Sequence, residues 1–204
     1  RIDPALYSKP ALNLLGRLKQ TSPDPCGLVT FPRRTVRTEY QYVGKVDYQW
    51  SASHSIFGRY IATTLKFPDP YAATGNVLTT NNDDAGFNNL AQSYALGSTY
   101  LISPTTINAF RMTVNRTRIR RIGASFFSAP SMGVKGYSEY PDHMSLAVTG
   151  GFSLGGRRYF SDATTAYQMG DDVSFVRGNH QMTLGGNLAQ WRSIERASTN
   201  DVGA

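Results

Sequence analysis

The chain has 204 residues, enough for one large domain or two small ones, and only 40% of them are hydrophobic, so a purely apolar core would be thin. Its formal charge of +7 could suggest nucleic acid, but the basic residues are mostly spread out and no nucleic-acid-binding signature accompanies them. No run of about 18 apolar residues exists, which excludes a transmembrane helix but not strands that cross a membrane.

The first 35 residues predict a loop segment with a short helix. Leu12, Leu15 and Leu18 follow helical spacing, and Pro10 suits the first turn of such a helix. The first residue is Arg1 rather than methionine, and no signal-peptide pattern follows, so we expect a piece of a longer chain. The single cysteine, Cys26, can form no internal disulfide, and its role is open.

A long strand is predicted from Val36 to Trp50, because polar and apolar residues alternate through it with period two. The segment "SASH" (residues 51–54) then predicts a turn, and a second strand runs back from Ser55 to about Lys66. One face of this hairpin is apolar and rich in aromatic residues: Tyr40, Tyr42, Val46, Tyr48, Trp50, Ile56 and Tyr60.

The same unit recurs twice more along the chain. Its strands are predicted at 91–102 and 107–118, joined by "SPTT", and at 165–176 and 181–191, joined by "RGNH". Long stretches rich in Gly, Pro, Asn and Ser separate the three hairpins, at about residues 67–90 and 120–164. Short turns and long loops therefore alternate.

The expected fold is all-β: an antiparallel meander of about six long strands. At about 11 to 13 residues the strands are longer than those of typical globular sheets and match the length that a tilted strand needs to cross a bilayer. Six strands are too few to close a lumen, so we expect a sector of a larger barrel with short periplasmic turns and long extracellular loops. The predicted division is 1–35 as loop, 36–194 as barrel strands and 195–204 as the start of the next loop. A soluble β-sandwich remains an alternative, which explains the alternation but not the long strands.

In a barrel the apolar side of each strand faces lipid and the polar side faces the lumen. Lipid contact is predicted for Tyr42, Val46, Tyr60, Phe110 and Leu184. The lumen side is predicted to carry four charged residues that contact a plug domain or solute: Lys45, Asp47, Arg59 and Arg111. Asp171 conflicts with this pattern, because its position directs a carboxylate toward lipid unless a bulge at Gly170 turns it.

Two short basic clusters, residues 116–121 and 157–158, are expected near the outer surface, where they could pair with lipid phosphates. Other chemical signals are weak. The Gly-rich "GGFSLGGRR" lacks the Lys-Ser/Thr of a phosphate-binding loop, and "NNDDAG" (residues 81–86) lacks the spacing of a calcium loop. His54, His143 and His180 lie far apart in sequence, so no metal site is expected. We expect neither an enzyme nor a bound cofactor.

Three separated stretches resemble the barrel region of TonB-dependent outer-membrane receptors of the Oar-like subgroup: "YVGKVDYQWSASHSIFGRY", "LISPTTINAFRMTVNR" and "YQMGDDVSFVRGNHQMTLGGNLAQW". The opening "IDPALYSKPALNLL" is similar to an extracellular loop of these proteins. The resemblance implies a location in the bacterial outer membrane and a barrel of 22 strands closed by an N-terminal plug. It also implies that the TonB system drives uptake.

The function expected from this resemblance is uptake of a bulky solute. The expected partners are outer-membrane lipid, the protein's own plug, the TonB system and an unidentified solute. Nucleic acid is not among them. A passive porin-like or structural barrel is the first alternative, and a secreted soluble β-domain that binds glycans is the second. The solute itself cannot be read from the sequence.

Overall fold

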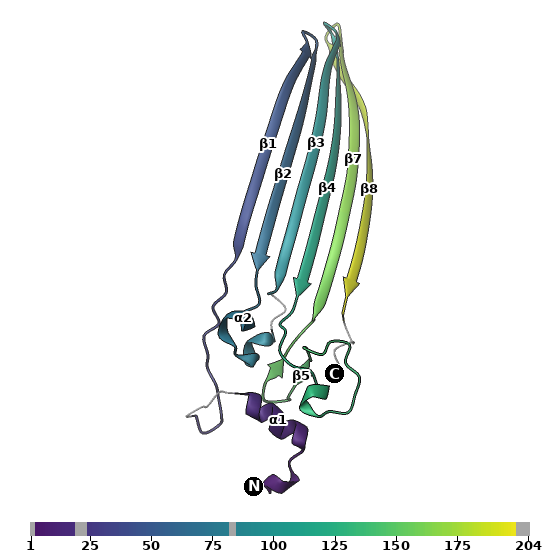
Figure 1. Cartoon of the computed structure of the whole chain (residues 1–204). Helices are drawn as coiled ribbons and strands as arrows, with labels where there is room; N and C mark the ends of the chain where they lie inside the picture. The colour runs from purple at the N-terminus through teal and green to yellow at the C-terminus, as the bar shows by residue number, and fades with distance from the viewer. Residues whose placement is uncertain (1–2, 19–23, 82–84, 199–204) are drawn as a thin grey trace.

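The structure, a computed structural model, describes residues 3–18, 24–81 and 85–198. It consists of one long antiparallel sheet with the loops gathered at one end (Figure 1). The six strands of the sheet follow chain order: β1 (Thr38–Ser51), β2 (His54–Phe67), β3 (Phe87–Ser103), β4 (Thr106–Ile122), β7 (Tyr159–Arg177) and β8 (His180–Ala197). This confirms the expected all-β meander. The sheet is open, so β1 and β8 are its two edges.

The loop end contains short elements, and all of them except the predicted short helix lie in stretches that the sequence analysis assigned to loops. They are η1 (Pro4–Leu6), α1 (Lys9–Arg17), α2 (Tyr71–Thr74), η2 (Val77–Thr80), η3 (Pro130–Met132) and the small hairpin β5 (Leu146–Ala147) and β6 (Ser153–Leu154). None of the described helices is both long and apolar enough to span a membrane.

Helix α1 begins after Ser8, whose side chain accepts a hydrogen bond from the Ala11 backbone N–H and so caps the helix. Asn13 on this helix donates to the Met132 carbonyl at 3.0 Å, which ties α1 to η3. The predicted short helix is therefore present, and it packs against a loop more than a hundred residues away in the chain.

Five of the six strands extend further than their alternation predicted, whereas β1 begins two residues later than predicted and ends one residue later. They have 14 to 19 residues each, and β8 continues to Ala197, past the expected boundary at 194. The additional residues lie mostly at the loop end, where polar and apolar residues no longer alternate between the two faces. Backbone pairing continues there without interruption. The last six residues of the predicted loop at 195–204 lie outside the described part.

The register of the sheet is staggered at the turn end. His54, the first residue of β2, pairs with Tyr100, and β3 continues to Ser103. Thr106, the first residue of β4, pairs with Phe175, and β7 continues to Arg177. From one hairpin to the next the turn end moves by two or three residues of about 3.3 Å along the strands and by two strand spacings of about 4.8 Å across them. When the turns lie at one level in the membrane, these two distances correspond to a strand tilt of roughly 40° from the membrane normal. Strands of outer-membrane barrels have this tilt.

The register also defines the two faces of the sheet, since paired residues point to the same side. The face that we call the aromatic face contains the row Val46, Gly58, Leu96, Met112, Met169 and Leu188. The opposite face, the polar face, contains the neighbouring row Lys45, Arg59, Ala95, Thr113, Gln168 and Ala189. All five residues predicted to contact lipid lie on the aromatic face.

The only sizeable core among the described residues lies in the loops rather than against the sheet. It is formed by buried side chains from segments far apart in the chain: Val77, Phe127, Met132, Met144 and Leu154. Few side chains of the sheet are buried: those of the edge strands are exposed, including Tyr42, Val46, Leu184 and Leu188 of the aromatic face, and many of those between are half-buried. A single sheet with an exposed apolar face requires an apolar surrounding.

Candidate functional site

Tyrosines form a row across the loop-side part of the aromatic face. Tyr60, Tyr94 and Tyr167 share one row of the register, and the rings of Tyr60 and Tyr94 have centroids 4.8 Å apart. Gln92 donates to the hydroxyl oxygens of Tyr60 and Tyr94 at 2.8 and 3.1 Å. Amphipathic rings held in this way are typical of the interface between the hydrocarbon and the head groups.

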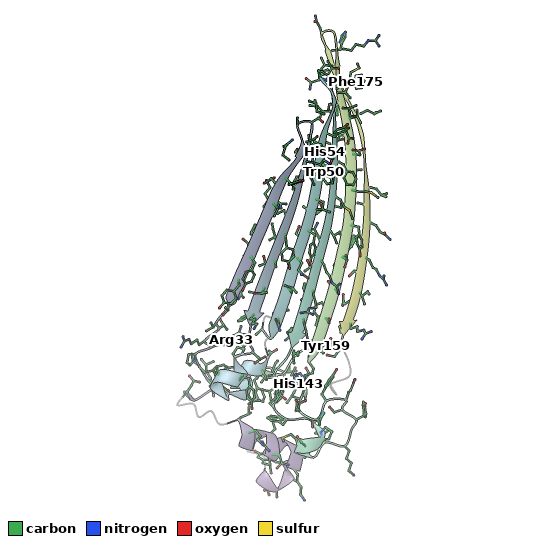
Figure 2. All side chains as sticks on the ribbon, turned by 45° about the horizontal axis from the view of Figure 1, so that its top comes forward. Arg33, Trp50, His54, His143, Tyr159 and Phe175 are labelled. Atoms are coloured by element: carbon green, nitrogen blue, oxygen red, sulfur yellow. The ribbon has the colours of Figure 1, made fainter. Side chains whose placement is uncertain are left out.

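A second aromatic group lies at the turn end of the same face. Trp50, His54 and Tyr100 are neighbours, with ring centroids 6.5 Å apart for Trp50 and His54 and 5.2 Å apart for His54 and Tyr100. His54 and Trp50 lie near the turn end of the sheet, and Phe175 lies further out on the tip of the longest hairpin (Figure 2). From Tyr40 to Trp50 the aromatic face of β1 spans ten residue steps, which at a tilt of roughly 40° cover about 25 Å of membrane thickness.

The four charged residues predicted to face the lumen all lie on the polar face, in two adjacent rows. Lys45 pairs with Arg59 across β1 and β2, and the next row toward the turns joins Asp47 to Arg111 through Phe57 and Gly97. The Lys45 and Asp47 side chains form an ion pair with an N–O distance of 2.8 Å. Their role in plug or solute contact stays a prediction.

Asp172 belongs to the same group, although the sequence analysis did not select it. Its carboxylate lies 3.7 Å from the Arg111 guanidinium, on the polar face of β7. Strand parity could have identified Asp172, because adjacent residues of one strand point to opposite faces.

A shallow cup lies beside Arg111 on the polar face. Its volume is about 320 Å³, and Gly170 forms part of its wall between Arg111 and Asp172. A side chain at Gly170 would displace the Asn187 amide, because a Cβ there would come within 2.2 Å of the Asn187 side-chain oxygen. The cup is open to the lumen side and bordered by one cation and one carboxylate.

Asp171 lies on the aromatic face, and the suggested bulge at Gly170 is absent. The register continues without a shift through Arg111–Gly170 and Phe110–Asp171. Asn108, on the same face, donates to the Asp171 carboxylate at 2.6 Å. The charge is thus accommodated by a neighbouring amide and by its position near the turn end, since a charge costs less close to the interface.

The basic clusters divide between two environments, which corrects the expectation that all of them face the lipid head groups. Arg121 is buried: it donates to the carbonyls of Ala85 and Arg157 at 2.9 and 2.6 Å. Arg158 forms an ion pair with Asp142 at 3.0 Å. These two arginines hold the loops together. Arg116, Arg118 and Arg120 are exposed on the aromatic face.

The three histidines are separate in space as well as in sequence. His54 lies near the turn end, His180 is exposed at a turn, and His143 is buried within the loops. The described residues contain no group of three or more His, Cys, Asp or Glu suited to a metal ion. Residues 82–84, which belong to the "NNDDAG" stretch compared above with a calcium loop, lie outside the described part of the chain.

His143 is a structural residue of the loop assembly. It is 1% exposed, and its Nδ1 and Nε2 atoms lie 2.7 and 2.9 Å from the carbonyl oxygens of Ala124 and Gly156. Carbonyl oxygens only accept, so both ring nitrogens can donate at once only when the imidazole is protonated.

Two carboxyls near His143 have shifted pKa values of opposite sign. The hydrogen bond from Ser125, and then the charge of Arg158, hold the pKa of Asp142 below its usual range. Burial raises the pKa of Asp69, although a backbone hydrogen bond from Tyr71 and the charge of Arg121 oppose that shift. One Asp69 carboxylate oxygen is buried without a hydrogen-bond partner.

The long strands, the tilt and the two aromatic belts define a class of protein: a membrane-spanning β-barrel wall. A family model described as an outer membrane beta barrel domain matches residues 1–204, and the chain belongs to this family. No curated protein and no solved structure matches the chain. The location is therefore the bacterial outer membrane.

This result removes the soluble alternatives. A β-sandwich needs a second sheet that covers the apolar face, and within the described residues the only other sheet is the two-stranded β5–β6 hairpin in the loops. The secreted glycan-binding domain fails for the same reason.

Proposed function

We propose that the chain is part of the barrel wall of a TonB-dependent outer-membrane receptor that imports a bulky solute. The three stretches that resemble the Oar-like receptors support this proposal, and they include both faces of the sheet. The proposed partners are outer-membrane lipid on the aromatic face, and a plug domain of the same protein on the polar face. The other two proposed partners are the TonB system and an unidentified solute. Neither catalysis, a cofactor nor nucleic acid has a role in this proposal.

The observation that carries the proposal is the arrangement of charge on the polar face. Lys45, Asp47, Arg59, Arg111 and Asp172 occupy adjacent rows in the turn-side half of the sheet, and the 320 Å³ cup lies beside Arg111 and Asp172. A plug domain fills the lumen of such a receptor, and its surface must satisfy the charges of the wall. We assign these residues to plug contact rather than solute contact because solutes bind toward the extracellular loops.

A passive porin-like barrel is the second candidate, and conductance separates the two without knowledge of the solute. The full-length protein is reconstituted in a planar bilayer. A plugged receptor keeps a low conductance until the plug is displaced with urea, whereas a passive channel is open from the start. Constant high conductance of the wild-type protein would contradict the proposal.

Charge reversal on one strand provides a matched test of plug contact. Arg59 and Lys66 both lie on β2, but Arg59 is on the polar face and Lys66 on the aromatic face. Arg59→Glu together with Arg111→Glu should produce frequent spontaneous openings, because the plug loses its contacts with the wall. Lys66→Glu should leave the conductance of the closed protein unchanged. Equal openings in both variants would contradict plug contact by the polar face.

A further inference from the structure

Charges of opposite sign are separated between the two faces in the loop-side part of the sheet. The acidic residues of this region, Glu39, Asp162 and Glu195, all lie on the polar face. The aromatic face at the same height contains no acidic residue among the described strands and carries these cations: Lys66, Arg116, Arg118, Arg120, Arg192 and Arg196. A polar surface that faces water usually mixes both signs. An all-cationic surface indicates an anionic partner.

Five of these cations form a defined arrangement, which we call the arginine frame: Arg116, Arg118 and Arg120 on β4 and Arg192 and Arg196 on β8. The register places Arg116 and Arg192 in one row and Arg120 and Arg196 in another. All five side chains are exposed, and no ion pair is found for them within the described residues.

The strand between the two sides of the frame carries small residues. Ser161, Ala163 and Thr165 of β7 lie on the same face, each in a row with one arginine of β4. The two sides are separated by two strand spacings, or about 10 Å. The frame is therefore an open trough with guanidinium groups on both sides, wide enough for a head group that carries more than one phosphate.

An apolar hollow lies directly on the membrane side of the frame. Its volume is about 100 Å³, and its lining residues belong to the aromatic face except for Gln168: Met112, Tyr167, Met169, Leu188 and Gln190. The hollow is next to the Tyr60–Tyr94–Tyr167 row, while the first row of the frame is one step further toward the loops. A ligand that fits both features has an anionic head and an apolar tail.

The geometry points to a lipid-binding site at which the arginine frame holds the phosphates of an outer-leaflet glycolipid and the hollow receives part of one acyl chain. The long loops of outer-membrane barrels are extracellular, so the frame lies at the level of the outer-leaflet head groups. Arginine suits this ligand because its planar guanidinium binds phosphate with two parallel hydrogen bonds. The site depends on the barrel fold and is independent of what the barrel transports.

The test measures lipid binding to the full-length protein by native mass spectrometry in detergent. The added lipids are bisphosphorylated lipid A, its monophosphorylated form and phosphatidylglycerol. Wild type should prefer the bisphosphorylated lipid, then the monophosphorylated lipid, then phosphatidylglycerol. Replacement of Arg116 and Arg192 by Ser should weaken binding of the bisphosphorylated lipid by roughly tenfold or more, because charge-assisted hydrogen bonds are lost.

The matched control is Arg59→Ser with Arg111→Ser, which removes the same charge from the polar face and should leave lipid binding unchanged. The folding of each variant is checked by the heat-modifiable gel migration of a folded barrel. If the Ser variant of the frame does not fold, Arg116→Lys with Arg192→Lys replaces it in the test. This variant keeps the charge and should bind the bisphosphorylated lipid with intermediate affinity. The proposal is wrong if the frame variants bind as well as wild type. It is also wrong if phosphatidylglycerol binds as tightly as the bisphosphorylated lipid.

Discussion

Asn108 and Asp171 form a hydrogen bond of 2.6 Å on the aromatic face of the sheet. This pair is the one place among the described strands where a carboxylate lies among apolar residues of the aromatic face. Its neighbours across the sheet are Phe110 and Gly186. The amide lowers the cost of the charge, but it cannot replace the hydration that water provides.

Replacement of Asp171 by Leu should therefore stabilise the barrel, by about 1 kcal/mol, because the lipid face loses a charge near the interface. The gain is limited because the Asn108 amide loses its acceptor. The double replacement of Asn108 and Asp171 by Leu should be more stable than either single variant. Urea unfolding of the full-length protein in lipid vesicles measures these differences.

The adjacent Asp172 is the control for this prediction. It lies on the polar face and pairs with Arg111, so Asp172→Leu should destabilise the protein or leave its stability unchanged. If Asp172→Leu stabilises the barrel as much as Asp171→Leu, the assignment of the two faces is contradicted.

The contact between Gly97 and Phe57 should limit substitution on the polar face. A Cβ at Gly97 would come within 2.1 Å of the Phe57 ring, which crosses over this glycine from the neighbouring strand. Gly97→Ala should cost about 1–3 kcal/mol in unfolding free energy, since the ring must move. In a Phe57→Ala background, where the ring is absent, Gly97→Ala should cost little unfolding free energy. Gly44→Ala, where nothing lies within 4 Å, is the control and should have no measurable effect.

His143 should stabilise the extracellular loops without affecting the strands. His143→Phe leaves the carbonyls of Ala124 and Gly156 without their donor, at a cost of roughly 2 kcal/mol or more. Thermolysin digestion of outer membranes should cut the loops of this variant faster, while the barrel keeps its heat-modifiable migration. The exposed His180 is the control, and His180→Phe should digest at the wild-type rate. Equal digestion of His143→Phe and wild type would contradict this role.

The shifted pKa of Asp142 predicts how the loops respond to acid. Because the pKa of Asp142 is lowered in the folded loops, its contribution is present above the usual pKa of about 4 and is lost as the pH falls through the folded value. Asp142→Asn should therefore increase loop digestion at neutral pH. The difference from wild type should disappear in strong acid, measured with pepsin.

Asp69 should show the opposite dependence. Its pKa is raised by burial, so the ionised form weakens the loops at neutral pH, and protonation relieves this as the pH falls through the folded value. Asp69→Asn should protect the loops at neutral pH, and its advantage should vanish as the pH approaches about 4. Greater digestion of Asp69→Asn than of wild type at neutral pH would contradict this account.

The sequence predicted the strands wherever the two sides of the sheet differ in polarity. Alternation located Val46, Tyr60 and Leu184 on one face and Lys45 on the other, because lipid and lumen select different residues at every second position. The same reasoning failed at residues 119–122 and 159–164. There each face carries polar and apolar residues together, such as Ile119 with Arg121 and Arg120 with Ile122, so alternation gives no signal.

The loop assembly could not be predicted from local pattern. Its core joins Val77 of one long loop to Phe127, Met132 and Leu154 of the other, and these contacts depend on the three-dimensional path of both loops. Burial of Arg121 within a basic run is a further example, since its neighbours Arg118 and Arg120 are exposed. Strand parity separates Arg121 from these two, but its burial depends on contacts with Ala85 and Arg157 in the loops, which no local pattern shows.

The orientation of the two faces is tested most directly by spin labels at adjacent positions in the full-length protein. Leu188 and Ala189 are neighbours on β8 at nearly the same height, on the aromatic and polar face respectively. With Cys26 replaced by Ser, each residue is changed to Cys, labelled, and probed with oxygen, which concentrates in lipid, and with a water-soluble nickel chelate. The label at 188 should be accessible to oxygen and protected from nickel, and the label at 189 should show the reverse. Nickel access to both labels, or the reverse assignment, would contradict a membrane-spanning wall with its aromatic face in lipid.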